Sequence, residues 1–371
     1  MKHLYISILK LKPAILLSTI LLIGACSSTA YESSSTTPPL ACKASNNTSI
    51  NTHKVNDGFN VADGRLYDIN GNQFVMRGVN YPYAWFPQHD LNKQFADIAS
   101  TCANTVRVVL ANGEQWDRVN GKSVAKIIAT AKAHQLVTML EVHDITGFGE
   151  KEAAADPQTA IDYWLSDDIR KAIEGEEGFV LINIANEPFG NFSDPQLGHD
   201  LWLEFHMDAV KKLRAAGLKH TIVVDAPNWG QDSHMLMRDG KSAQTLFNSD
   251  SDKNLIFSVH MYQLFGSDKK VVDYLQTFVD RKFPLIVGEF AADHGPEHDV
   301  AEQAILSYSE KLSIGYLGWS WSGNSEGLGS LDIVNYFDVN QLSAWGETLI
   351  NSKNGIRATS VKCSCFPHND D

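Results

Sequence analysis

The stretch FVLINIANE at residues 179–187 decides how this chain folds. It begins as an uninterrupted apolar run, which is typical of a strand buried on both faces of a parallel sheet. It ends in Asn186 and Glu187, directly before Pro188. Because a carboxylate is costly to bury, we expect Glu187 at the end of a strand, where a functional site can use it.

Seven further runs share this character and alternate with helical stretches such as 162–175 and 201–217. Eight strand–helix units predict an α/β fold in which a parallel sheet closes into a single (β/α)8 or TIM barrel. Asp63-Gly64 predicts a short N-terminal β-hairpin that would cap the bottom of this barrel. The seven runs are FVMRGVN (74–80), TVRVVL (105–110), VTMLEVH (137–143), TIVVDA (221–226), LIFSVHMY (255–262), PLIVGEF (284–290) and GYLGWSW (315–321).

The first 25 residues are typical of an export signal. A basic lead precedes an apolar run at 14–23 that is too short to span a bilayer. The string LIGAC at 22–26 resembles the lipobox of bacterial lipoproteins, which implies cleavage before Cys26 and lipid on its thiol. We therefore expect an exported protein, anchored through Cys26 to the bacterial outer membrane or cell surface. Secretion without an anchor is the alternative.

The rest of the chain divides by composition. Residues 26–55 are rich in Ser, Thr and Pro and predict a flexible tether. Residues 56–360 suit one barrel-sized catalytic domain, and residues 361–371 form a C-terminal tail.

Four cysteines follow Cys26. Cys42 could pair with Cys363 or Cys365 and clip the two ends of the domain together, whereas we expect Cys102 to be a small buried thiol. The sequence does not separate the possible pairings.

Composition excludes several classes of protein. With 31 basic and 44 acidic side chains the net charge is −13, which argues against nucleic acid as a partner and leaves a neutral ligand as the simpler expectation. No His-x-His or His-Glu-x-x-His motif occurs, so we expect no metal, and no motif suggests a cofactor. The Gly-x-Ser-x-Gly string at 323–327 lies in a Gly/Ser-rich loop and not at a strand-to-helix turn, as a nucleophile elbow requires.

Glu187 and Glu289 each end an apolar run, the fourth and the seventh. Two carboxyl groups across one barrel mouth suit glycoside hydrolysis, in which one acts as proton donor and the other as nucleophile. Arg107 and the Tyr262 hydroxyl could stabilise the Glu289 carboxylate, and Asn186 could reach the sugar 2-OH. Retention of configuration predicts a separation of about 5–5.5 Å between the carboxyl groups.

Each of these residues also has a structural interpretation. A strand-end glutamate is often merely solvated, and Asp225 could cap the loop after its strand. His143 and His260 could be core histidines bonded to backbone. A non-catalytic, polysaccharide-binding surface lipoprotein would be the outcome if either glutamate were inactive.

The order of these residues resembles glycoside hydrolase family 5. That family has an Arg, a His, an Asn-Glu, a His-x-Tyr, a Glu and a Trp at successive strand ends. The resemblance implies that Glu187 is the acid/base and Glu289 the nucleophile, and that the remaining residues of the pattern bind the substrate. The matching residues here are Arg107, His143, Asn186-Glu187, His260-x-Tyr262, Glu289 and Trp319.

Longer strings are similar to bacterial endo-β-1,4-mannanases of subfamily 8, over about 58–356. They include ANTVRVVLANGEQW, LEVHD, INIANEP, VDAPNWGQ and GWSWSGN. The chain departs from many such proteins at Pro188-Phe189, where they have Trp-Tyr, so the wall near the leaving group should differ. Mannan as substrate follows from this resemblance alone. A β-1,4-glucanase with the same machinery remains the alternative.

Aromatic side chains at strand ends suggest platforms for sugar rings. Several along one groove would favour an endo-acting enzyme on a polysaccharide, and we expect a monomer. We assign the floor under the cleaved sugar to Trp319, with Trp321 as the fallback, and expect Trp164, Trp202 and Trp345 to pack in the core. The strand-end tryptophans are Trp85, Trp116, Trp229, Trp319 and Trp321.

Overall fold

The computed structural model describes residues 42–44, 58–234, 237, 239–295 and 298–367. The predicted signal segment, its Cys26 and most of the predicted tether lie outside these residues. None of the described helices is long and apolar enough to cross a membrane.

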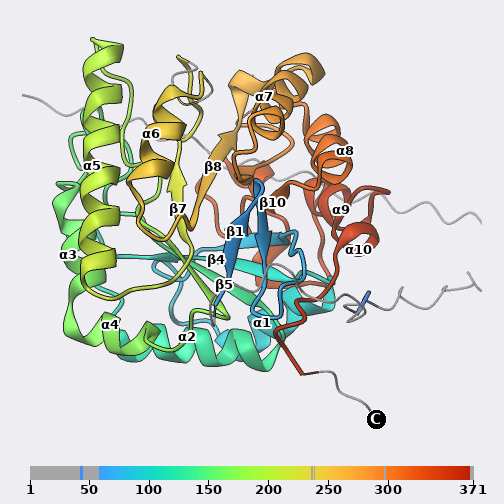
Figure 1. Cartoon of the computed structure of the whole chain (residues 1–371). Coiled ribbons are helices and arrows are strands. Elements are labelled where there is room, and N and C mark those ends of the chain that lie inside the picture. The colour runs from blue at the N-terminus through green and yellow to red at the C-terminus, as the bar shows by residue number, and fades with distance from the viewer. Residues whose placement is uncertain (1–41, 45–57, 235–236, 238, 296–297, 368–371) are drawn as a thin grey trace, which may run out of the picture. The chain divides into compact units, whose positions relative to one another are not determined.

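Eight parallel strands form a closed barrel in the order β10-β3-β4-β5-β6-β7-β8-β9 (Figure 1). This confirms the predicted TIM barrel, with each strand inside or within one residue of its predicted run. The strand residues are all buried because barrel strands are covered on both faces. The strands are β3 (Arg77–Tyr81), β4 (Thr105–Leu110), β5 (Val137–Val142), β6 (Val180–Asn183), β7 (Ile222–Asp225), β8 (Leu255–Met261), β9 (Leu285–Phe290) and β10 (Gly315–Gly318).

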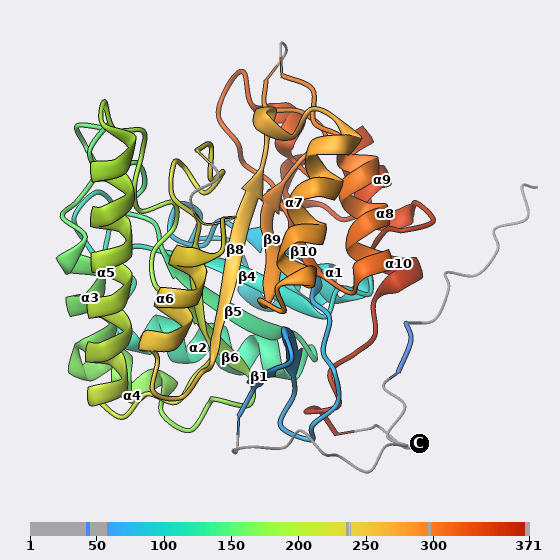
Figure 2. The same cartoon turned by 45° about the horizontal axis from the view of Figure 1, so that its top comes forward.

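Helices follow the strands and lie outside them (Figure 2). The predicted helix over 162–175 is in fact two helices, because Ser166 between them is extended. The helices are α1 (Leu91–Ser100), α2 (Gly121–Ala133), α3 (Gln158–Leu165), α4 (Asp167–Ile173), α5 (Pro195–Ala215), α6 (Lys241–Ser249), α7 (Asp268–Asp280), α8 (Glu302–Leu312), α9 (Ala344–Asn351) and α10 (Ile356–Thr359), with 3-10 turns η1 (Gln263–Phe265), η2 (Gly329–Leu331) and η3 (Asn335–Phe337).

The predicted hairpin consists of β1 (Asn60–Ala62) and β2 (Arg65–Tyr67), which pair antiparallel. Phe59 and Leu66 pack with inward-facing side chains from the lower halves of the strands, including Met139 and Leu181. The hairpin therefore closes the bottom of the barrel and leaves the other end, at the carboxyl ends of the strands, free for a site.

The disulfides differ from our expectation. Cys42 bonds to Cys102, and Cys363 bonds to Cys365. Cys102 is thus not a free thiol. It lies in the turn between α1 and β4, at the lower end of the barrel. Beside this turn, Lys43 pairs with Val361 of the C-terminal segment in an isolated parallel β-bridge. Which cysteines pair depends on this proximity in the folded chain, and the spacing of cysteines along the sequence does not reveal it.

Candidate active site

A cleft of about 830 Å³ opens at the carboxyl ends of the strands. Active sites of (β/α)8 barrels occur at this end because the loops there are free to vary. Nine of the predicted site residues line it: Trp85, Trp116, His143, Asn186, Glu187, Trp229, Tyr262, Glu289 and Trp319.

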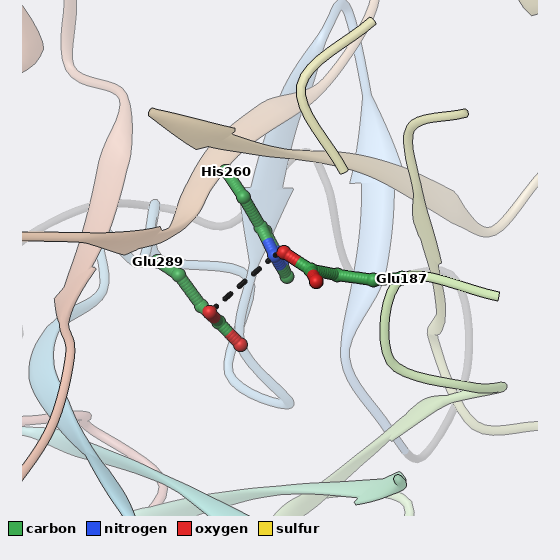
Figure 3. A group of neighbouring side chains, drawn as sticks. All are labelled: Glu187, His260 and Glu289. Atoms are coloured by element: carbon green, nitrogen blue, oxygen red, sulfur yellow. Dashed lines mark hydrogen bonds and ion pairs between the residues drawn. The ribbon is translucent and has the colours of Figure 1, made fainter. Parts of the chain in front are cut away.

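Glu187 and Glu289 approach each other across this cleft (Figure 3). One carboxylate oxygen of each, together with a ring nitrogen of His260, lie within 4.8 Å of one another. This close approach is in keeping with the separation of about 5–5.5 Å of retaining glycosidases, and it is shorter than the about 6.5–9.5 Å of inverting ones.

Glu187 follows β6 in a left-handed backbone conformation with φ +39°. Its backbone N–H donates to Oδ2 of Asp225 at 3.1 Å, which fixes this unusual conformation. Burial raises the pKa of Glu187, the nearby Glu289 carboxylate adds to the increase, and the hydrogen bond from His260 opposes it. The net raised pKa suits a group that must carry a proton at near-neutral pH.

Glu289 lies within β9 and is 3 % exposed. The Arg107 guanidinium donates to its Oε1 at 2.7 Å, and the Tyr262 hydroxyl donates to its Oε2 at 2.9 Å. Both oxygens therefore accept hydrogen bonds, one of them from a permanent cation. These contacts stabilise an ionised carboxylate and hold it still, as a nucleophile requires.

Arg107 is fully buried beneath Glu289 and does not line the cleft. Our expectation that it contacts substrate is therefore corrected, because it acts through other side chains. Burial disfavours its charge, but the Glu141, Asp225 and Glu289 carboxylates outweigh this and raise its pKa. The guanidinium donates to Asn183 at 2.9 Å, Asn80 at 2.9 Å and Asn186 at 2.7 Å, as well as to Glu289.

His260 is likewise fully buried behind the cleft, so the expectation of a direct substrate contact is corrected here too. Its Nδ1 lies 2.7 Å from Glu187, and its Nε2 lies 3.3 Å from Asp225. Burial would lower the pKa of His260, but the Glu289 and Asp225 carboxylates raise it to about 10. A protonated imidazole has no lone pair to offer, so the Glu187, His260 and Glu289 group is poorly suited to hold a cation.

Asn186 and His143 form the wall beside Glu187. The Asn186 carbonyl oxygen accepts from Arg107, so its amide nitrogen points to Nε2 of His143 at 3.4 Å. The other ring nitrogen, Nδ1, lies 3.0 Å from Glu141. Two fixed partners therefore orient the Asn186 amide group, which is placed to reach a sugar hydroxyl.

Aromatic rings cover one side of the cleft. Trp85 lies 4.8 Å from His143, 5.5 Å from Trp116 and 6.3 Å from Trp319, measured between ring centroids. Such rings offer flat apolar faces to the C–H groups of a pyranose. Trp229 lines the cleft at a different loop, and its indole N–H donates to Glu150 at 2.6 Å.

Trp321 does not belong to the cleft, which corrects its assignment as an alternative floor. It is fully buried, and its indole N–H donates to Gln94 at 2.7 Å. The strand β10 ends at Gly318, so the alternation that would place Trp319 and Trp321 on one face does not continue through both. Trp164, Trp202 and Trp345 are buried, as predicted. Phe189, one of the two residues at which the chain differs from many subfamily members, is also buried and does not line the cleft.

Sequence reasoning missed three contributors to the site. Asp225 was weighed as a loop cap, yet it is fully buried and contacts Arg107 and His260. Glu141 is also fully buried, and its Oε2 makes no hydrogen bond to the described residues. The ring of His294 stacks on Tyr262 with centroids 4.6 Å apart. A carboxylate inside an apolar strand, as in TMLEV, was the available signal for Glu141.

The arrangement brings together in one cleft a carboxyl group with a raised pKa, a carboxylate held by Arg107 and Tyr262, and several aromatic rings. Residues 67–325 match the family described as cellulase (glycosyl hydrolase family 5). The chain is 50 % identical over 309 residues to a mannan endo-1,4-beta-mannosidase of Cellvibrio japonicus, covering 83 % of this chain and 69 % of that protein. Among solved structures, it resembles the beta-mannanase from Thermomonospora fusca with TM-score 0.79 and 44 % identity, covering 84 % of this chain and 99 % of that one. The structure of that protein in complex with mannohexaose is similar to this chain with TM-score 0.78, covering 84 % of this chain and 99 % of that one. The chain belongs to glycosyl hydrolase family 5.

Proposed function

We propose that this protein is an endo-acting, retaining β-1,4-mannanase. The observation that carries the proposal is that a carboxylate oxygen of Glu187 and one of Glu289 lie within 4.8 Å of each other. Burial raises the pKa of Glu187, whereas Arg107 and Tyr262 donate hydrogen bonds to Glu289. Glu289, held by Arg107 and Tyr262, attacks the anomeric carbon while Glu187 gives its proton to the leaving oxygen. A covalent glycosyl–enzyme forms as the glycosidic bond breaks. Glu187, now ionised, takes a proton from a water molecule whose oxygen attacks the anomeric carbon. The bond to Glu289 breaks, and the sugar is released with its original configuration.

Mannan is supported by the relatives, which are named as mannanases at 44–50 % identity, and by the mannohexaose complex of one of them. The cleft of about 830 Å³, lined by several aromatic side chains, supports internal cleavage of a polymer. The test compares linear mannan, glucomannan, galactomannan and carboxymethylcellulose. We expect a rapid fall in viscosity with slow release of reducing ends on the mannans. Faster turnover of carboxymethylcellulose would overturn the choice of substrate.

We also propose export and anchoring through a lipid on Cys26. The support is the basic lead, the short apolar run and the LIGAC string at 22–26. In cells that process lipoproteins, wild-type protein should incorporate labelled fatty acid and sediment with membranes, whereas Cys26→Ala should do neither. Equal labelling of both proteins would contradict the anchor.

A further inference from the structure

Tyr336 combines an exposed ring with an unfavourable backbone. It lies in η3 with φ +55° and ψ +31°, the left-handed region that β-carbon-bearing residues avoid. It is also 85 % exposed, so its ring gains almost nothing by burial. Glycine or asparagine would suit this turn better. A tyrosine here therefore does nothing evident for folding, which points to something outside the molecule that its ring contacts.

The turn that carries Tyr336 is held firmly on both sides. The backbone N–H of Asn335 donates to the Gln341 carbonyl at 2.8 Å, and a β-bridge joins Val334 to Leu342. The Asp338 carboxylate accepts from the Asn340 backbone at 3.1 Å and from the Gln341 side chain at 2.9 Å. The ring is thus attached to a fixed backbone, which lowers the entropy lost when it binds a ligand.

The same turn is packed against the wall of the cleft. The peptide N–H between Tyr336 and Phe337 donates to Oγ of Ser322 at 3.2 Å, and Ser322 lines the cleft. The Phe337 ring packs on Phe86, another lining residue, with centroids 5.1 Å apart. The backbone of Tyr336 is therefore joined directly to the residue that backs the wall formed by Phe86 and Ser322, while its own ring stays exposed.

The strand order indicates which half of the sugar chain lies along this wall. Tyr336 follows β10, and in the closed ring of eight strands β10 is opposite β6, which precedes Glu187. Glu187 donates its proton to the oxygen that departs, so the departing half of the sugar chain lies toward β6. The side at β10 receives the half that becomes attached to Glu289.

We propose that Tyr336 is an outer platform for a pyranose of the retained half of a β-1,4-linked mannan chain, beyond the enclosed cleft. This inference rests on the proposed function. An aromatic ring is the chemistry expected, because its flat face matches the C–H face of a sugar and needs no charge. Because Tyr336 is not among the residues that line the cleft, only a chain long enough to extend beyond the cleft reaches the platform.

The test measures steady-state kinetics on linear β-mannan and on mannotetraose for four variants. Tyr336→Ala should raise KM for the polymer about three- to tenfold, with kcat and the mannotetraose constants unchanged. Tyr336→Phe keeps the ring and should match wild type. Tyr336→Gly removes the ring and the backbone strain together, so it should show the KM of Tyr336→Ala with a Tm at or above that of wild type. Val361→Ala, which trims another exposed apolar side chain at the far end of the barrel, is the matched control.

An unchanged polymer KM in both Tyr336→Ala and Tyr336→Gly, while wild type cleaves mannotetraose, overturns the platform alone. A rise in KM that is equal for polymer and mannotetraose also overturns it, because the ring would then act inside the cleft. If wild type cleaves no β-mannan of any length, the proposed function fails, and the platform fails with it.

Discussion

The Nδ1 atom of His260 lies 2.7 Å from Oε1 of Glu187. The histidine is fully buried, and neighbouring carboxylates raise its pKa to about 10, so it places a positive charge beside Glu187. That charge lowers the pKa of Glu187 against the increase caused by burial. The pKa of Glu187 is thus set by opposing effects: burial and the Glu289 carboxylate raise it, and the positive charge of His260 lowers it.

Replacing His260 by Gln removes the positive charge and keeps a side chain of similar reach. The pKa of Glu187 should rise further, because the interaction that lowers it is lost. Since Glu187 must be protonated to start the reaction, kcat/KM falls as pH rises through this pKa, and the alkaline limb of the pH profile should move to higher pH. The maximal rate should fall about tenfold or more.

His199→Gln is the control for this variant, because His199 is a buried histidine that hydrogen-bonds to Ser242 away from the cleft. Its pH profile should keep the wild-type shape. An alkaline limb that stays in place or moves to lower pH in His260→Gln would contradict the assigned direction.

Replacing each glutamate by Ala should separate the two roles. Glu187→Ala should lose about 10²–10⁴-fold in rate on mannan, but retain faster attack on substrates whose leaving group needs no proton. Added azide should then yield a glycosyl azide of unchanged configuration, because Glu289 still forms the intermediate. Glu289→Ala should instead give the inverted azide from an activated glycosyl fluoride. Product configuration by NMR checks both, and the opposite pattern would exchange the assignments.

Arg107→Lys should show that geometry matters beyond charge. Lysine keeps the positive charge but cannot donate to Asn80, Asn183, Asn186 and Glu289 at once, as Arg107 does. We expect kcat to fall about 10²-fold with the fold retained. Arg107→Ala removes one of the two cations that face the buried Glu289 and Asp225 carboxylates, the other being His260, and should lose up to about 3–5 kcal/mol of stability. Urea unfolding and kinetics on the same preparations measure both; wild-type kcat in Arg107→Lys would argue against the positioning role.

Gly147→Ala should displace Trp229 from the cleft wall. A Cβ at Gly147 would lie 2.2 Å from the Trp229 ring, and φ there is +78°. Gly175 offers a matched control, since its φ is +80° but a Cβ there meets nothing within 4 Å. Both variants should lose about 1–3 kcal/mol to backbone strain. Only Gly147→Ala should also raise KM for mannan, and an equal KM in the two variants would show that Trp229 does not contact the substrate.

The barrel could be predicted because its strands are buried on both faces and therefore appear as apolar runs. The positions of Glu187 and Glu289 followed from the same pattern, since each interrupts the run where it ends. The roles of residues that act from beneath the cleft were harder to predict. Arg107 and His260 were expected to touch substrate, because a sequence shows which side chains gather at strand ends and not how deep each one lies.

Two other misses have similar physical causes. Trp321 was considered as a floor of the cleft because side chains alternate between the two faces of a strand. That alternation no longer holds after Gly318, where β10 ends. The Cys42–Cys102 bond depends on where the start of the domain passes the α1–β4 turn, and this is fixed by packing at the lower end of the barrel.

That bond lies at the end of the barrel opposite the cleft, because Cys42 is fastened to the α1–β4 turn. The covalent cross-link and the loops that line the cleft are thus at opposite ends of the barrel, and a polymer can enter and leave the cleft without meeting the cross-linked end.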